Sequence, residues 1–251
     1  MILTVANQKG GVGKTTTTFN LGFALATKGD SVLMVDLDPQ ASLTLACGIE
    51  NSAGRSISEV VGSHQEGTLG LDDVIVELGD NIHLAPSDIL LASHEAGLWQ
   101  RWNREHILAL AIEPILDNYD HVIIDSPPNL GLLTVNALAA SDRTLIPTIP
   151  DYLSLRGLVL FLETAHRIRE QLNRELEILG VLLNFFDQRL LHTRDVVAAM
   201  ERQGIPVLPF QVRRSVRLAE ASLAHEPIIR YDPRNAASAT YLDLAEVVRN
   251  A

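Results

Sequence analysis

Short apolar runs alternate along the chain with longer stretches in which apolar residues recur at a helical period. The apolar runs are expected to form buried strands at residues 2–6, 31–35, 82–85, 121–124, 144–147, 179–183 and 207–209. The helical stretches cover residues 15–28, 104–117, 131–140, 154–173, 190–203 and 235–249. This alternation predicts an α/β fold in which a mostly parallel sheet carries helices on both faces. Residues 50–80 hold five glycines and show weak periodicity, which favours an irregular excursion.

Composition narrows the class of protein. With 251 residues, 47% of them hydrophobic, the chain is expected to form one domain over residues 1–251. No apolar run is long enough to span a membrane, and a strand that starts at residue 2 leaves no room for a signal peptide. The single cysteine, Cys47, cannot form an internal disulfide and is typical of a cytoplasmic protein. A net charge of −11 argues against nucleic-acid binding over the whole surface but leaves room for a local basic patch.

A glycine-rich segment directly after the first predicted strand indicates a phosphate-binding loop of the P-loop NTPase kind. Its glycines let backbone N–H groups surround phosphate oxygens, its lysine contacts the β- and γ-phosphates, and its hydroxyl binds Mg²⁺. Gln8 stands where the usual motif has its first glycine. The strand before the loop and the helix after it supply the context that an anion site needs. The residues expected to hold the nucleotide are Gly10, Gly11, Val12, Gly13, Lys14, Thr15 and Thr16.

The distribution of lysine singles out this loop. The chain has only three lysines, and two of them, Lys9 and Lys14, lie here. Lysine is a compact point charge, whereas arginine is a planar fork, so a chain that otherwise uses arginine favours a specific need for lysine at these positions. For Lys9 the alternative is an exposed charge on a solvated loop.

Aspartates follow two of the predicted strands. In open α/β sheets ligands bind beyond the carboxyl ends of the strands, where Asp36, Asp38 and Asp125 fall. We expect Asp125 to act on Mg²⁺ together with the Thr15 hydroxyl, Asp38 to position the attacking water, and Asp36 to support the metal. The alternative is that these aspartates only cap the following helices, and it is most open for Asp36.

Three ordered motifs give the chain a family resemblance. They cover residues 6–17, 35–41 and 123–138, and weaker colinear matches lie at residues 157–158 and 216–221. The chain is similar to ParA-type partition ATPases of the ParA/MinD group, P-loop ATPases with a deviant Walker A motif, in their short Soj-like form. The resemblance extends over nearly the full length.

The resemblance implies a nucleotide cycle. In this family ATP closes a homodimer in which the extra lysine, here Lys9, reaches the phosphates bound by the partner subunit. The resemblance therefore places Lys9, Lys14 and Asp38 in ATP hydrolysis, which is weak until a ParB-like activator stimulates it. It also places Asn184 and the loop from Pro209 to Val212 around adenine. The ATP-bound dimer of the family binds DNA without sequence preference, which implies a cytoplasmic, nucleoid-associated protein.

A cluster of arginines is the expected DNA-binding element. Arg213, Arg214 and Arg217 lie within five positions, and arginines that neutralise phosphates give salt-sensitive, sequence-independent affinity. Arg214 and Arg217 match arginines of the family, although Val212 and Arg213 replace its usual Ile-Pro pair. The alternative is a solvated loop and helix start.

Other function classes remain. A related ATPase could position a protein cargo over the nucleoid, and a metabolic P-loop enzyme is the rival from a different class. A reductase with an iron–sulfur cluster lacks its cysteines, since Cys47 stands alone. A membrane switch of the MinD kind needs a basic amphipathic tail, whereas residues 241–251 carry two acids and one arginine. We therefore expect no membrane partner.

Overall fold

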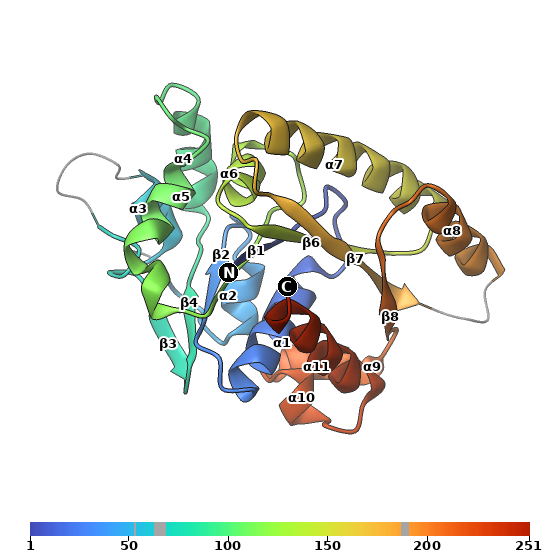
Figure 1. The fold of residues 1–251 in the computed structure, drawn as a ribbon. Coiled ribbons are helices and arrows are strands. Elements are labelled where there is room, and N and C mark those ends of the chain that lie inside the picture. The colour runs from blue at the N-terminus through green and yellow to red at the C-terminus, as the bar shows by residue number, and fades with distance from the viewer. Residues whose placement is uncertain (53, 63–68, 187–190) are drawn as a thin grey trace.

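A computed structural model describes residues 1–52, 54–62, 69–186 and 191–251, and an eight-stranded sheet runs through them in the order β3-β4-β2-β5-β1-β6-β7-β8 (Figure 1). The strands are β1 (Ile2–Val5), β2 (Val32–Asp36), β3 (Val76–Gly79), β4 (Ile82–Ala85), β5 (His121–Asp125), β6 (Arg143–Thr148), β7 (Glu177–Phe186) and β8 (Val207–Arg213). Only the edge pair β3–β4 is antiparallel within this sheet. The predicted α/β class with a mostly parallel sheet is confirmed.

Helices cover both faces of the sheet (Figure 1). One face packs against α1 (Lys14–Thr27), α2 (Ser42–Ala46), α9 (Val216–Leu223), α10 (Ile228–Tyr231) and α11 (Ala236–Arg249). The other packs against α3 (Ile57–Gly62), α4 (Leu90–Leu98), α5 (Ile107–Ile112), η1 (Glu113–Asn118), α6 (Leu132–Ala139), α7 (Tyr152–Gln171) and α8 (Leu191–Arg202). None of the helices in the described ranges is both long and apolar enough to span a membrane.

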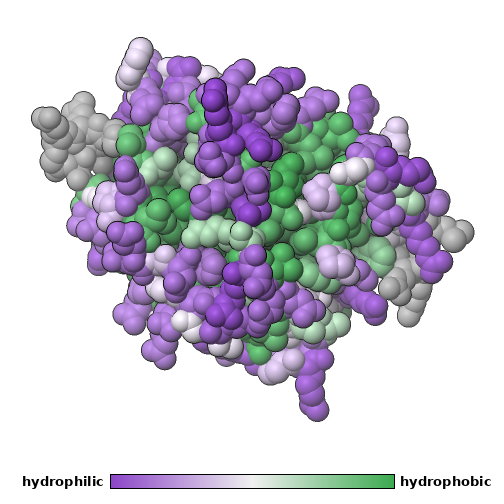
Figure 2. Space-filling model, in the orientation of Figure 1, coloured by the Kyte–Doolittle hydropathy of each residue, from purple (hydrophilic) through white to green (hydrophobic). Residues whose placement is uncertain are grey.

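The core explains why the central strands are apolar at every position. In β2, Val32 and Met34 pack toward α1, whereas Leu33 and Val35 pack toward α5 and α6. All four are fully buried, as a strand covered on both faces requires. Figure 2 shows hydrophilic residues over most of the visible surface, with hydrophobic residues gathered in patches between them.

The structure differs from the pattern in several segments. The helix expected over 104–117 is divided into two elements: the α-helix α5 and, directly after it, the 3₁₀ helix η1. The change occurs near Pro114, which lacks the N–H that the interior of an α-helix uses. The segment 50–80, expected to be irregular, contains α3 and β3, while its residues 53 and 63–68 lie outside the described ranges. Helix α8 begins at Leu191, and residue 190 of its predicted span also lies outside them. Helices α2, α4, α9 and α10 were not predicted.

Three central strands end at one level. Val5 of β1 pairs with Asp125 of β5, and Asp125 pairs with Asp36 of β2. The P-loop leaves β1 at this edge and enters α1. The two aspartates and the loop therefore share the carboxyl edge of the sheet, where ligands of open α/β sheets bind.

Candidate nucleotide-binding site

The loop between β1 and α1 has the backbone conformation of a phosphate cradle. Gly11 and Gly13 have φ angles of 72° and 89°, in the left-handed region that glycine adopts without strain. A Cβ at Gly13 would lie 2.6 Å from Asn184 Nδ2, so glycine is also needed there for space. The 14-residue helix α1 begins at Lys14 and directs its free N–H groups toward the loop. Free amides and helix dipole together make an anion site.

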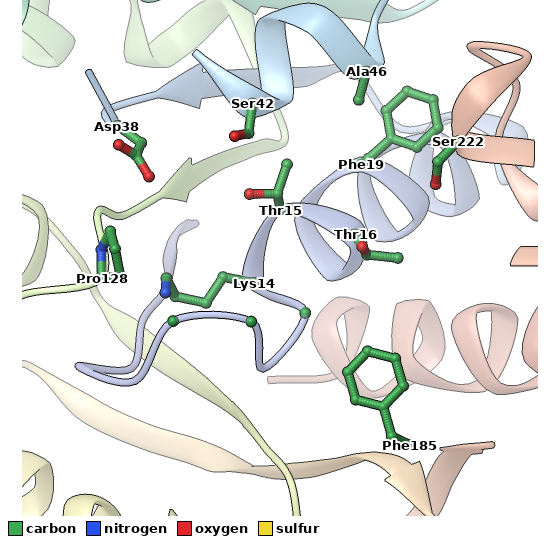
Figure 3. Close-up of a pocket in the computed structure, with 13 residues that line it drawn as sticks. Lys14, Thr15, Thr16, Phe19, Asp38, Ser42, Ala46, Pro128, Phe185 and Ser222 are labelled. Atoms are coloured by element: carbon green, nitrogen blue, oxygen red, sulfur yellow. The ribbon is translucent and has the colours of Figure 1, made fainter. Parts of the chain in front are cut away.

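A cavity of about 470 Å³ opens over this loop. Figure 3 shows Lys14, Thr15 and Asp38 toward one end of it and Phe19, Ser222 and Phe185 toward the other. It is lined by Gly10, Gly11, Gly13, Lys14, Thr15, Thr16, Phe19, Asp38, Ser42, Ala46, Pro128, Phe185 and Ser222. The side chain of Val12, in the same loop, is fully buried and does not line the cavity. One end thus carries charges and hydroxyls suited to phosphates, and the other carries aromatic rings suited to a base.

Lys14 is held inside the loop. Its side chain is buried, and Nζ donates to the Lys9 carbonyl at 3.3 Å. Burial lowers the pKa of Lys14, and the carboxylates of Asp125 and Asp38 oppose that shift. A buried ammonium whose neighbours are backbone carbonyls and acids is arranged to meet an anion that enters the loop.

Asp125 is the buried acid of the site. Its Oδ2 accepts the Thr15 hydroxyl at 2.7 Å, and its Oδ1 accepts the Thr18 hydroxyl at 3.4 Å. Burial, reinforced by the nearby Asp36, raises the pKa of Asp125 to about 8. A raised pKa favours the protonated form of the carboxyl group, and a cation beside it would favour the charged form.

The donor set here is suited to Mg²⁺. Hydroxyl and carboxylate oxygens, as on Thr15 and Asp125, are the hard ligands that this ion prefers. Across residues 1–52, 54–62, 69–186 and 191–251, no three His, Cys, Asp or Glu side chains are grouped so as to hold a metal. Mg²⁺ commonly needs only one or two carboxylates, because phosphates and water complete its shell.

Asp36 lies at the expected edge of the sheet and is hydrogen-bonded to the segment that follows it. Its Oδ2 accepts the Thr44 backbone N–H at 2.8 Å and the Thr44 hydroxyl at 2.7 Å, and its Oδ1 accepts the Asp38 N–H at 3.2 Å. Burial raises its pKa to about 6. Both oxygens are thus engaged in fixing the segment from Asp38 to Thr44, and the metal role of Asp36 stays a prediction. Thr44 is a residue that the sequence pattern did not indicate.

Asp38 lies at the phosphate end of the cavity. It lines the cavity with Lys14 and Thr15 (Figure 3), and one carboxylate oxygen accepts the Gln40 N–H at 3.0 Å. Its backbone is held by Asp36. The structure thus brings Asp38 to the phosphate end of the site, while its role in hydrolysis stays a prediction.

Lys9 points away from its own cradle. Its Nζ contacts both carboxylate oxygens of Asp151, at 2.9 and 3.3 Å, and the Ser154 hydroxyl at 2.7 Å. Asp151 also caps α7 by accepting the Ser154 N–H at 2.7 Å. Burial acts to raise the pKa of Asp151, but these donors outweigh it and hold the pKa below its usual range. Gln8 adds a second tie to α7, from Nε2 to the Gly157 carbonyl at 2.7 Å.

The two elements expected around adenine, Asn184 and the segment 209–212, differ in their relation to the cavity. Asn184 lies beside the loop: its Nδ2 donates to the Val12 carbonyl at 2.7 Å, and its buried Oδ1 has no hydrogen-bond partner in the described part of the chain. An unpaired buried acceptor next to a base-sized cavity suits the exocyclic amine of adenine. The segment from Pro209 to Val212 belongs to strand β8 and is not a loop. Pro209 is exposed and lines neither this cavity nor the side cavity beside it, whereas Val212 lines the side cavity with Asn184, so the adenine role of the segment stays a prediction. Pro209 is tolerated in this strand because β8 is an edge.

The three arginines of the cluster are exposed on one segment next to the cavity. Arg213 ends β8, Arg214 lies in the link, and Arg217 is in the first turn of α9. Arg217 pairs with Glu220 at 3.0 Å, an exposed pair of little energetic value. Arg214 lies over the ring of Phe185, with Cζ 5.8 Å from the ring centroid. Neither Phe185 nor Ser222 was expected in the site, because a single phenylalanine in strand β7 and a single serine in helix α9 carry no motif of their own.

A glycine cradle at a helix N-terminus, a buried lysine, and a hydroxyl bonded to a buried aspartate define a P-loop nucleoside triphosphatase. A family model described as an AAA domain matches residues 1–178. Soj of Bacillus subtilis, a sporulation initiation inhibitor, is 41% identical over 249 residues, which cover 98% of this chain and 97% of Soj. The chromosome partitioning protein ParA of Caulobacter vibrioides is 37% identical over 252 residues, covering 98% of this chain and 93% of ParA. The chain belongs to the ParA/Soj family of partition ATPases.

Solved structures place the same fold around a nucleotide. Cobyrinic acid a,c-diamide synthase of Mycobacterium smegmatis superposes with a TM-score of 0.83 at 33% identity, covering 98% of this chain and 91% of that one. A structure of the same synthase with a bound ATP analogue and magnesium has a TM-score of 0.79 at 36% identity, covering 89% and 90% of the two chains.

Proposed function

We propose that the protein is an ATP-hydrolysing partition protein that dimerises with ATP and binds DNA without sequence preference, in chromosome or plasmid segregation. The observation that carries the proposal is the double use of lysine in one P-loop. Lys14 is buried inside the cradle, whereas Lys9 leaves it for α7. A lysine that reaches the phosphates of a partner subunit has to point away from its own phosphate site, as Lys9 does. The identity with Soj and ParA over nearly the whole chain supports the same function.

The cofactors in this proposal are ATP and Mg²⁺. Thr15 and Asp125 would hold the metal, which supplies charge neutralisation at the phosphates. Lys14 and the amides of the cradle bind the phosphates, and Asp38 orients the attacking water. Phosphoryl transfer needs chiefly such positioning, so no covalent intermediate is invoked. The unpaired Oδ1 of Asn184 receives the amine of adenine.

Dimerisation requires Lys9 to exchange its contacts. In the single chain its charge is balanced by Asp151 at 2.9 Å. The pair is about one-third exposed on each side, so breaking it costs little. Phosphates of an ATP molecule on a second copy offer more negative charge than one carboxylate. ATP thus favours the dimer through a contact that ADP lacks, which is a population shift.

DNA binding rests on the exposed arginines Arg213, Arg214 and Arg217. With a net charge of −11, the protein as a whole repels DNA, so a local basic segment has to supply the attraction. A dimer doubles the number of these arginines on one particle, which ties DNA affinity to the ATP state. A ParB-like activator and a nucleoid-associated position in the cytoplasm complete this proposal, with positioning of a protein cargo as its nearest variant.

The test is binding to a nonspecific DNA duplex across a salt series with ATP, ADP or no nucleotide. The parent is compared with Lys9→Ala and with the double variant Arg214→Ala/Arg217→Ala. The matched control is Arg167→Ala/Arg169→Ala, two exposed arginines of α7 on the opposite face of the sheet. We expect binding only with ATP, loss of binding in Lys9→Ala, and a shallower salt dependence in Arg214→Ala/Arg217→Ala, by about 0.9 for each phosphate contact removed.

A metabolic ATP-dependent enzyme is the second candidate, because the synthase of M. smegmatis shares 33% identity over 98% of this chain. The same experiment separates the two. If the protein binds ATP but ignores DNA in every nucleotide state, the partition proposal is wrong and the metabolic candidate takes its place.

A further inference from the structure

One side chain, Phe185, belongs both to the nucleotide cavity and to the arginine segment. Its ring lines the 470 Å³ cavity and an adjoining side cavity of about 200 Å³ (Figure 3). The guanidinium of Arg214 lies over the same ring, with Cζ 5.8 Å from its centroid, within the range of a cation–π contact. The same aromatic ring therefore lines the cavity that would hold a base and contacts the arginine.

The backbone holds this ring in an unusual position. Phe185 has a φ of 54°, a left-handed conformation that is strained for a bulky residue. The pairing of β7 with β8 is irregular here, between Asn184, which pairs with Val212, and Phe186, which pairs with Arg213. The pairing of both neighbouring residues with β8 thus holds the backbone of Phe185 in its left-handed conformation. Strain maintained by the surroundings is typical of a functional position.

The neighbours of Phe185 connect it to both binding events. On one side Asn184 holds the P-loop through the Val12 carbonyl. Across the side cavity lie Leu218, Ala219 and Ser222 of α9, the helix whose first turn carries Arg217. A base that enters between the P-loop and α9 therefore meets the ring of Phe185 and the arginine segment together.

We propose that Phe185 couples the nucleotide base to DNA binding: the base fixes the ring, and the ring holds the Arg214 guanidinium in the position that meets a phosphate. The inference rests on the proposed DNA-binding function and assigns its regulation to one residue. Because coupling between two sites is reciprocal, DNA must also raise the affinity for ATP by the same factor. Phe185 is thus a positioning residue and takes no part in hydrolysis.

The experiment uses the full-length chain and a double-mutant cycle. DNA affinity is measured at saturating ATP for the parent, Phe185→Leu, Phe185→Tyr, Arg214→Ala and Phe185→Leu/Arg214→Ala. Phe186→Leu is the matched control, since the neighbouring ring packs with the cluster on the α7 face of the sheet. Thermal melting confirms that each variant is folded, and a fluorescent ATP analogue reports nucleotide affinity with and without DNA.

We expect Phe185→Leu to weaken DNA binding at saturating ATP about two- to fivefold, which is the range of an exposed cation–π contact. Phe185→Tyr retains a ring and should bind as the parent does. Arg214→Ala should cause no further loss in the Phe185→Leu background, and DNA should raise the ATP affinity of Phe185→Leu by a factor two- to fivefold smaller than it does for the parent. Phe186→Leu should match the parent in all of these measurements.

Two outcomes overturn the inference in distinguishable ways. If the parent binds DNA with ATP but Phe185→Leu binds equally well, or if the two substitutions act additively, Phe185 carries no coupling and the proposed function stands. If the parent ignores DNA in every nucleotide state, the proposed function itself fails and the coupling fails with it.

Discussion

Asp125→Asn is expected to stabilise the nucleotide-free protein while it removes the response to Mg²⁺. The carboxyl group is fully buried and accepts two hydroxyl hydrogen bonds, from Thr15 and Thr18, and among the described residues no cationic side chain forms an ion pair with it. An asparagine side chain has nearly the same shape, and its amide can still meet both hydroxyls. The substitution therefore removes a buried acid with little change in packing.

The magnitude follows from the difference in pKa between the folded and unfolded states. Burial raises the pKa of Asp125 from 3.8 to about 8. Between these values the unfolded chain loses a proton that the folded protein keeps, so the contribution of this group to stability falls as the pH rises. At about 1.36 kcal/mol for each pH unit above 3.8, the cost at pH 7 approaches ~4 kcal/mol. We expect Asp125→Asn to recover about 2–4 kcal/mol, or roughly 5–15 °C in Tm.

The assay is thermal unfolding in EDTA without nucleotide at pH 6, 7 and 8. Asp36, whose pKa is raised to about 6, adds a slope of the same sign mainly below that range. The gain of Asp125→Asn over the parent should therefore grow from pH 6 to pH 8. Asp30→Asn is the control, because Asp30 pairs with Arg249 at 3.0 Å and the same change there should lower Tm. An Asp125→Asn variant that melts at or below the parent temperature at pH 8 would refute the reasoning.

The remaining predictions concern the cradle and its supports. Gly13→Ala should abolish ATP binding, measured by calorimetry, and lower the free energy of unfolding by about 1–2 kcal/mol. In Gly11→Ala the added Cβ meets open space, so this variant should show only the destabilisation that comes from backbone strain. Asn184→Ala should weaken ATP binding about tenfold and leave GTP binding unchanged, since adenine offers its 6-amino group to Oδ1 where guanine has a carbonyl oxygen; equal losses for both nucleotides would contradict this. Asp151→Ala should lower stability by about 1 kcal/mol through loss of the α7 cap, and Asp151→Asn, which keeps the cap, should melt near the parent temperature.

The sequence predicted the sheet because each central strand is buried on both faces. An apolar run such as residues 122–124 is expected in a strand that is covered on both faces. The rule that ligands bind beyond the carboxyl ends of strands then brought Asp36 and Asp125 to one edge, and the pairing of these two residues confirms their common level. The P-loop was predictable because its chemistry lies within one contiguous segment.

Features that depend on contacts between distant segments could not be predicted in this way. Lys9 and Asp151 are 142 positions apart, and nothing in either segment indicates their pairing. The engagement of Asp36 with Thr44 depends on the short helix α2, whose five residues give no measurable period. Pro209 was assigned by motif position alone, and its strand turned out to extend to Arg213.

Asp125 and Lys9 have surroundings that Mg²⁺ and ATP would change. Burial raises the pKa of Asp125 to about 8, and Lys9 forms an ion pair with Asp151. Mg²⁺ beside Asp125 would stabilise the charged carboxylate, and the phosphates of a nucleotide on a second copy would attract Lys9 more strongly than Asp151 does, because the Lys9–Asp151 pair is about one-third exposed. The free energy that distinguishes the two states is therefore stored in a few residues around the loop. Changes to Asp125 or Asp151 should alter the balance between monomer and dimer without altering the fold.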